Sequence, residues 1–286
     1  MINTHFTIEN TVLTIGDDDQ IPLPFDFTKK MKSLLYHPSS VFVSNGEVFF
    51  ADRSNHRVRK VLRNGQIVTI CGIGIAGYNG DGQLATDAQL NEPCSVVVSS
   101  LNQVYISEMN GHRIRKIDPC GIISTIAGTG KIGYNGDNKL ATNAQLKTPI
   151  GLFVTDDEKV LFVEFLNHRV RMIDQNGIIS TIAGNGVGGF NGDGQLATSA
   201  SLRYPTSVFQ YKHEIYISET DNQRIRKIDQ NGIISTIFRN GAYDEMQDTN
   251  EFDPDTIFIH NAQVYFSDVN DNLIRRVLPN GLDRDR

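Results

Sequence analysis

The sequence predicts an all-β propeller of five four-stranded blades. Three features of the chain predict it: an internal repeat, four strand-like runs in each repeat and an unpaired strand at the amino-terminal end. The repeat has a period of about 56 residues, and self-similarity near such lengths is typical of solenoids and propellers. Its clearest marker is a basic segment that starts at Asn55 and returns at Gly111, Asn167, Asn222 and Asp271. Five copies predict five blades.

Each copy contains four short runs rich in β-branched or aromatic residues. In the second copy these runs are 95–98, 103–108, 113–118 and 122–126. Asn, Gly and Pro residues separate them, and such residues favour turns. Each copy is therefore predicted to form a four-stranded antiparallel meander.

The two chain ends predict how the propeller closes. The fifth copy provides three strands and ends after Leu278 without a fourth. The segment 10–16 aligns with the fourth strands of the other copies, yet no blade precedes it. We expect it to complete the last blade and remove the open sheet edge.

The whole chain, 1–286, is then one domain. Its blades cover about 38–72, 93–128, 149–184, 205–238, and 254–282 together with 8–16. The alternative is a six-bladed propeller truncated by one blade.

The third-strand motif His-Arg-Ile-Arg-Lys-Ile-Asp at 112–118, and the run Asn-Gly-Ile-Ile-Ser-Thr-Ile-Ala-Gly at 176–184, resemble the NHL repeat. The resemblance covers nearly the whole chain from about residue 8. The added segment 133–146 is similar to the longer blades of bacterial and teneurin-like members. This resemblance implies a β-propeller; members usually have six blades, whereas this sequence supplies five.

Composition limits the classes of function. The net charge is −6 and the isoelectric point is near 5.6, so no general basic field attracts nucleic acid. No apolar run is long enough to cross a bilayer, and the start of the sequence lacks the pattern of a secretory signal. The three cysteines occupy unrelated repeat positions, which disfavours a disulfide framework or zinc site. We expect a cytoplasmic, monomeric protein without cofactors.

Repeated charged residues predict a scaffold role. An acid ends the second strand of every copy, and a basic residue follows five positions later in four of the five. A tight turn between these strands would pair them. The acids are Asp52, Glu108, Glu164, Glu219 and Asp268, and the bases are Arg57, Arg113, Arg169 and Arg224.

Two motifs suggest metals, and both are interpreted as structural. A lyase branch of the NHL family holds metal with histidines in the central channel, but His56, His112 and His168 start third strands, where they lie too far apart to share an ion. The Asn-Gly-Asp-Gly segments at 79–82 and 191–194 lack the ligand spacing of calcium loops. We expect a turn there, with Asp accepting backbone N–H bonds before a short helical or coiled stretch.

The predicted function is non-catalytic binding of a protein or peptide. The face that carries the turns between second and third strands, together with the long loops between blades, varies most among copies. Phe165 and Met109 are apolar residues at such turn tips, where they either anchor a partner or pack beneath a neighbouring loop. The expected binding residues are Arg53, Met109, Phe165, Asp221, Arg239 and Tyr243.

Two alternative functions stay open. One is a propeller lyase or hydrolase with a metal in the central channel, using residues at the starts of the first strands. The other is an RNA-binding NHL module. No nucleophile or phosphate-binding motif occurs in the chain.

Overall fold

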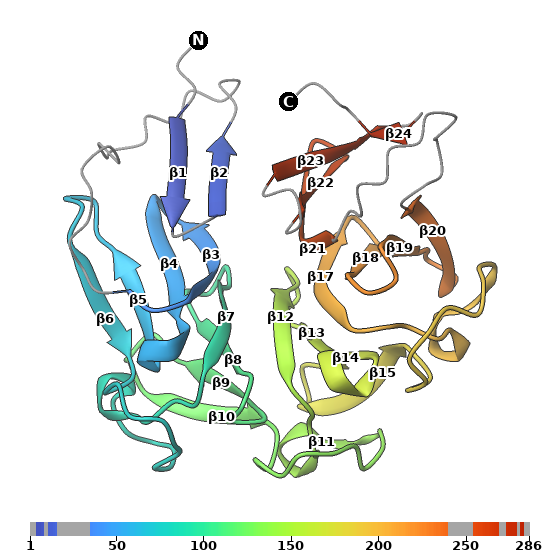
Figure 1. Cartoon of the computed structure of the whole chain (residues 1–286). Coiled ribbons are helices and arrows are strands. Elements are labelled where there is room, and N and C mark those ends of the chain that lie inside the picture. The colour runs from blue at the N-terminus through green and yellow to red at the C-terminus, as the bar shows by residue number, and fades with distance from the viewer. Residues whose placement is uncertain are drawn as a thin grey trace. The chain divides into compact units, whose positions relative to one another are not determined.

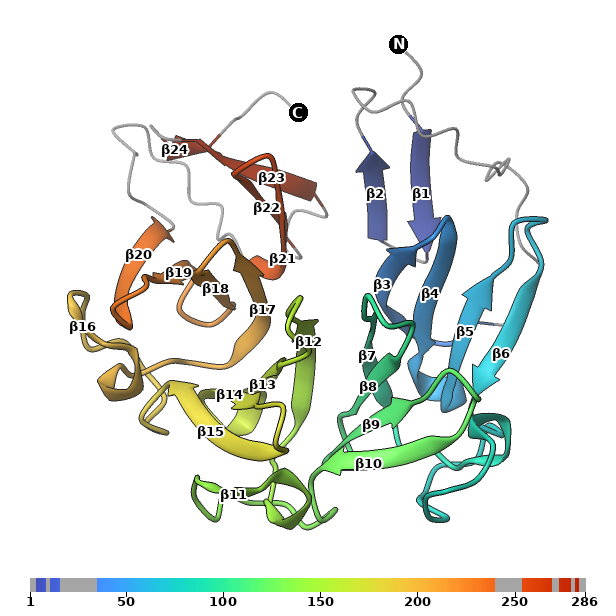
Figure 2. The ribbon, with the colours of Figure 1, turned by 180° about the vertical axis from the view of Figure 1, so that it is seen from behind.

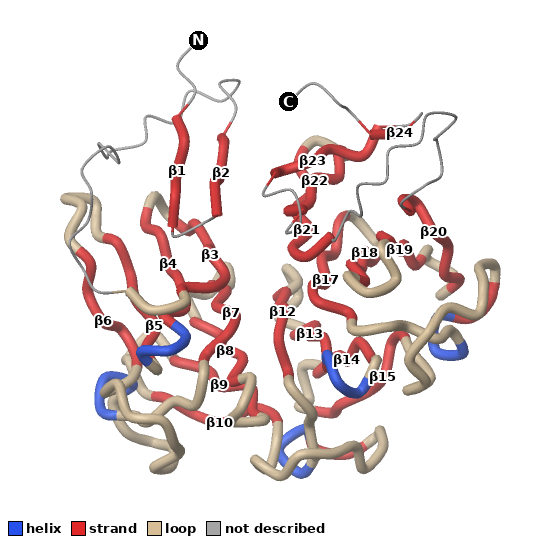
Figure 3. The backbone as a smooth tube through the Cα atoms, viewed as in Figure 1, coloured by secondary structure: helices blue, strands red, loops and turns tan. Residues whose placement is uncertain are grey.

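The computed structural model describes residues 4–8, 11–15, 35–239, 254–268, 273–278 and 281–282. Within these residues the regular structure is β-strand, apart from short 3-10 turns (Figure 1, Figure 3). Five antiparallel sheets follow one another along the chain, each a meander of four strands. The predicted all-β fold of five four-stranded blades is confirmed.

The chain forms two compact units. One contains residues 1–132 and 140–149, and the other contains residues 133–139 and 150–286. The first unit holds two blades: β3 (Pro38–Ser44), β4 (Glu47–Asp52), β5 (Arg57–Val61), β6 (Ile67–Cys71), and then β7 (Pro93–Val98), β8 (Val104–Glu108), β9 (Arg113–Ile117), β10 (Ile123–Ala127). Figure 2 shows β3 to β6 side by side in sequence order.

The second unit holds the other three blades. The third and fourth blades are β12 (Pro149–Val154), β13 (Val160–Glu164), β14 (Arg169–Ile173), β15 (Ile178–Ala183), and then β17 (Pro205–Tyr211), β18 (Glu214–Glu219), β19 (Arg224–Ile228), β20 (Ile233–Arg239). The fifth blade is β21 (Pro254–His260), β22 (Gln263–Asp268), β23 (Leu273–Leu278), β24 (Gly281–Leu282).

The prediction that an amino-terminal strand completes the last blade is wrong. The segment expected to complete the last blade, β2 (Thr11–Ile15), pairs antiparallel with β1 (Thr4–Ile8) instead. The fourth strand of the fifth sheet is β24, which pairs with β23. Local antiparallel pairing explains the difference, because only two residues separate β1 from β2 and closing so short a loop costs little chain entropy.

Apolar layers pack each blade against the next within a unit. In the first unit Val58, Leu90, Val96 and Ile106 belong to one buried cluster shared by the first two blades. In the second unit one cluster joins the third and fourth blades, and another joins the fourth and fifth. The alternation of buried and half-exposed residues along the strands follows from the two-residue period of a sheet.

Two blades gain a fifth strand from the loop that precedes them. β11 (Lys139–Leu140) pairs with β15, and β16 (Gln195–Leu196) pairs with β20. In the second blade the equivalent loop makes one bridge, Leu84 to Ile122. These additions cover the outer edge of each sheet, which would otherwise present unpaired backbone groups. Short 3-10 helices follow them: η2 (Ala85–Asp87), η3 (Ala141–Asn143) and η5 (Ala197–Ser199).

Candidate functional site

A buried acid at the end of each second strand forms an ion pair with the third strand of the same blade. The acids that end the second strands are all buried, with at most 1% exposure. Each accepts from an arginine seven residues later, at 2.5 to 3.2 Å. The pairs are Asp52–Arg59, Glu108–Arg115, Glu164–Arg171, Glu219–Arg226 and Asp268–Arg275.

Each acid was predicted to pair with the arginine five residues later, but it pairs with the arginine seven residues later. Glu108 and Arg113 are directly opposite in register, as expected. The side chain of Arg115, which lies on the same face two residues farther along, is fully buried and makes the pair. A diagonal cross-strand neighbour is within reach of a long side chain. Burial draws the pKa of Glu108 upward, whereas the Arg115 guanidinium opposes that shift.

The first arginine of the third strand has a different role. Arg57, Arg113 and Arg169 donate to carbonyl oxygens of Ile73, Thr129 and Asn185, just after the fourth strand of the same blade. The guanidinium of Arg113 also lies 3.9 Å from the ring centroid of Tyr78. The same stacking recurs for Arg169 over Tyr134 and for Arg224 over Phe190. These arginines hold the loops between blades.

The Asn-Gly-Asp segments connect one blade to the next. Asp81 accepts from Arg115 at 2.9 Å and from the Thr125 hydroxyl at 3.0 Å, and both of these residues belong to the following blade. Asp137 and Asp193 repeat this arrangement with Arg171, Thr181, Arg226 and Thr236. The expected turn and short helical stretch are present, but the Asp side chains accept from side chains rather than from backbone N–H groups. The buried arginine requires this second acceptor, because a desolvated guanidinium is costly when unpaired.

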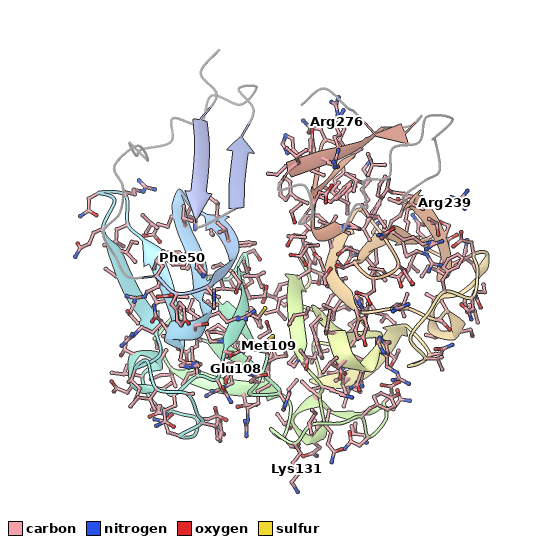
Figure 4. The ribbon with its side chains drawn as sticks, in the orientation of Figure 1. Phe50, Glu108, Met109, Lys131, Arg239 and Arg276 are labelled. Atoms are coloured by element: carbon pink, nitrogen blue, oxygen red, sulfur yellow. The ribbon has the colours of Figure 1, made fainter. Side chains whose placement is uncertain are left out.

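The predicted binding residues in the first unit lie beside one another. Arg53, at the tip of the first blade, pairs with Glu92 at 3.8 Å. The Met109 N–H, at the tip of the second blade, donates to the Glu92 carbonyl at 2.9 Å. Figure 4 marks Met109 next to the buried Glu108. Glu92 thus joins two tips, a role that was not predicted from the sequence.

A second cluster forms at the tips of the second unit. Phe165 is half-buried, and its ring stacks on Tyr204 with centroids 4.8 Å apart. Leu166, the next residue, is 37% exposed. Asp221 pairs with Arg203 at 3.2 Å, and both side chains are exposed. An apolar aromatic pair with an exposed leucine and a solvated ion pair can bind a peptide side chain.

The remaining two predicted residues are Arg239 and Tyr243. Arg239 is exposed at the end of β20 (Figure 4), opposite Arg224 in the strand register. Tyr243 lies outside the described residues.

The residues missed by sequence reasoning share one position. Glu92, Thr148 and Tyr204 each precede the proline that starts the first strand of the next blade. Their φ angles are 50°, 54° and 47°, in the left-handed region. A non-glycine residue in this conformation before a proline costs free energy. The repeated X-Pro dipeptide was the signal that could have located them.

Other reactive groups form no centre within the described part of the chain. There, no group of three or more His, Cys, Asp or Glu side chains could hold a metal ion. Burial raises the pKa of Cys71 to about 12, which keeps its thiol protonated. Among the described helices, none is long and apolar enough to span a membrane.

Comparisons with known proteins identify the repeat. No protein-family profile matches the sequence. Teneurin-m of Drosophila melanogaster is 31% identical over 170 residues, which cover 55% of this chain and 6% of the relative. NHL repeat-containing protein 2 of Gallus gallus is 35% identical over 106 residues, which cover 36% of this chain and 14% of the relative. The chain is an NHL-type β-propeller.

Solved structures agree with this fold. A streptogramin B lyase superposes with a TM-score of 0.58 at 15% identity, over 86% of this chain and 67% of that one. A nidogen/laminin complex matches with a TM-score of 0.58 at 11% identity, over 84% of this chain and 75% of that chain. At these identities the similarity shows the fold alone. The NHL-type chain also spans only a small part of the length of the two relatives above.

Proposed function

We propose that this NHL-type propeller is a non-catalytic binding module for a protein or peptide. The observation that supports it most directly is the tip cluster of the second unit. There, Leu166 is exposed beside the Phe165–Tyr204 stack, and the Arg203–Asp221 pair provides charges of both signs. The buried ion pairs beneath the tips keep the backbone uniform, so that the tip side chains are free to differ among blades.

The protein whose structure was solved in a nidogen/laminin complex supports this proposal by analogy of fold. Cytoplasmic location and a monomeric state stay predictions within it.

Selection from a random peptide-display library tests the binding proposal. Peptides captured by the purified chain are expected to lose at least about tenfold in affinity for Leu166→Asp and Phe165→Ala, because truncating a central anchor costs about 2 kcal/mol or more. Leu101→Asp is the matched control, since Leu101 is 57% exposed at the turn between β7 and β8, at the other end of the strands. Equal loss for Leu101→Asp, or no loss for the tip variants, contradicts the proposal.

One observation supports a lyase or hydrolase as the second candidate. Asp255 lies at the start of the first strand of the fifth blade. Burial raises the pKa of its carboxyl group, and hydrogen bonds from Thr206 and Thr256 oppose this rise. An acid of raised pKa is a frequent feature of catalytic sites. Elemental analysis of untreated protein tests the metal-dependent form: stoichiometric zinc or calcium supports it, and absence of both removes it.

A further inference from the structure

Three histidines make the same hydrogen bond in successive blades. The Nδ1 atoms of His56, His112 and His168 accept from backbone N–H groups 36 residues later. The donors are Glu92, Thr148 and Tyr204, at 3.2, 3.3 and 3.2 Å. An N–H group donates only to an unprotonated ring nitrogen. Each imidazole is therefore inferred to be neutral, with its proton on Nε2.

The three donors, Glu92, Thr148 and Tyr204, have left-handed backbone conformations, as described above. Each is followed by proline, so its backbone is restricted, and the histidine bond is one of the contacts that hold it there. The same residues support the tips. The Glu92 carboxylate pairs with Arg53, and its carbonyl oxygen accepts from the Met109 N–H. The Tyr204 ring stacks on Phe165, and its centroid lies 4.7 Å from that of the His168 ring.

The charged groups around these imidazoles are largely cationic or already paired. An arginine follows each histidine directly: Arg57, Arg113 and Arg169. On the opposing segments, the Glu92 carboxylate pairs with Arg53, Lys147 adjoins Thr148, and Arg203 beside Tyr204 pairs with Asp221. The carboxylates beneath the tips, Asp52, Glu108 and Glu164, are occupied by buried or largely buried arginines. Nothing in this set favours a charged imidazole strongly.

We propose that His56, His112 and His168 form an acid-sensitive device that releases the strained segment before each first strand when the imidazoles are protonated. Protonation turns Nδ1 into a donor that faces another donor, so the bond is lost. Release of Glu92 and Tyr204 then loosens the supports of both tip clusters. The device goes beyond the proposed binding function and does not require it.

The direction of the pH dependence follows from His112. Burial, and secondarily Arg113, lower the pKa of the His112 imidazole below its ordinary value of 6.5. A histidine with a lowered folded-state pKa stabilises the folded chain fully above the unfolded-state value, and this contribution is lost as the pH falls below about 6.5.

The chain supplies its own control residue. In the fourth blade the equivalent position is Gln223, which has the same left-handed backbone, with φ 51° against 50° to 53° for the histidines. A glutamine side-chain oxygen accepts a hydrogen bond at any pH between about 4 and 8. The triple variant His56→Gln, His112→Gln, His168→Gln therefore uses a residue that this position already accommodates.

Amide hydrogen exchange measured by NMR on the full chain tests the device. Protection factors, corrected for intrinsic rates, are compared at pH 7.5 and pH 5.0, while ¹⁵N shifts of the imidazoles report their protonation. The Glu92, Thr148 and Tyr204 amides are expected to lose about tenfold protection at pH 5.0, the equivalent of one hydrogen bond. The Gly121 amide, which donates to the Asp118 carbonyl at 2.9 Å beyond the far end of β9, is the reference and should not change.

The triple glutamine variant is expected to keep its protection at both pH values. The proposal is overturned if the three amides stay protected in parent protein whose imidazoles are protonated. It is equally overturned if the imidazoles stay neutral down to pH 5.0, or if the glutamine variant loses protection as the parent does.

Discussion

At the scale of residues, the repeated charges stabilise the scaffold. Every described acid at the end of a second strand is buried against an arginine, and three of these arginines reach a second carboxylate on the preceding loop. Such a network is strongly destabilised when one member is removed, because a buried charge is left unpaired.

Removing one arginine tests the network. We expect Arg115→Ala to lower the free energy of unfolding by about 3–5 kcal/mol, because Glu108 is left buried without its partner. Arg203→Ala removes one side of an exposed pair and is expected to cost only about 0–1 kcal/mol. Urea unfolding of both variants measures the difference; similar losses for the two would show that the buried network is not a main source of stability.

Two aspartates are expected to affect stability with opposite signs. Burial raises the pKa of Asp255, so the folded chain loses stability as the pH rises from about 3.9 through the folded value. Asp255→Asn is therefore expected to be more stable than the parent at pH 7, with the difference vanishing near pH 3. Equal unfolding midpoints of variant and parent at pH 7 would contradict this.

Asp229 is the opposite case. The Ile233 N–H, foremost among its hydrogen bonds, lowers the pKa of Asp229, so its contribution is present at neutral pH and is lost as the pH falls. We expect Asp229→Asn to be less stable than the parent at pH 7. Urea unfolding at pH 7 and pH 3 checks the sign, and a gain in stability at pH 7 would refute it.

At the scale of elements, the turn after the fourth strand depends on glycine in the first three blades, at Gly72, Gly128 and Gly184. Gly184 has φ 90°, and a Cβ there would lie 2.2 Å from the His168 carbonyl oxygen. Gly194, in the loop that leads to the next blade, has φ 77°, but a Cβ added to it would meet no atom within 4 Å. The two glycines thus share a left-handed backbone and differ in the space around them.

Alanine substitution separates these effects. Gly194→Ala is expected to cost about 1 kcal/mol from backbone strain alone. Gly184→Ala should cost roughly 1–3 kcal/mol more, because the backbone must also shift to relieve the clash. Thermal unfolding of the two variants provides the measurement, and equal costs would exclude a steric role for the His168 carbonyl.

Much of each blade follows from local sequence. The β-branched runs and Asx-Gly turns predict the strands from β3 to β23, apart from β11 and β16, because these signals act within a few residues. The partner of Glu108 was missed because Arg113 and Arg115 lie on the same strand face, and only burial distinguishes them. The strands β11 and β16 were missed because two residues carry no periodic signal; their pairing depends on a neighbouring blade.

At the scale of the whole molecule, charge argues against the RNA-binding alternative. The net charge is −6, and the arginines of the third strands are engaged with buried acids or loop carbonyls. We expect no RNA retention above background in a filter-binding assay at physiological salt. Retention that falls steeply as salt is raised would contradict this, because such a slope reports phosphate neutralisation.

The loops that add β11 and β16 to the following sheet have a consequence for the history of the gene. A segment of one repeat length carries an arginine that pairs with the aspartate of the preceding loop, such as Arg171 with Asp137. The same segment carries an aspartate that pairs with the arginine of the following blade, such as Asp193 with Arg226. A tandem duplication of that segment therefore inserts a unit compatible with either neighbour.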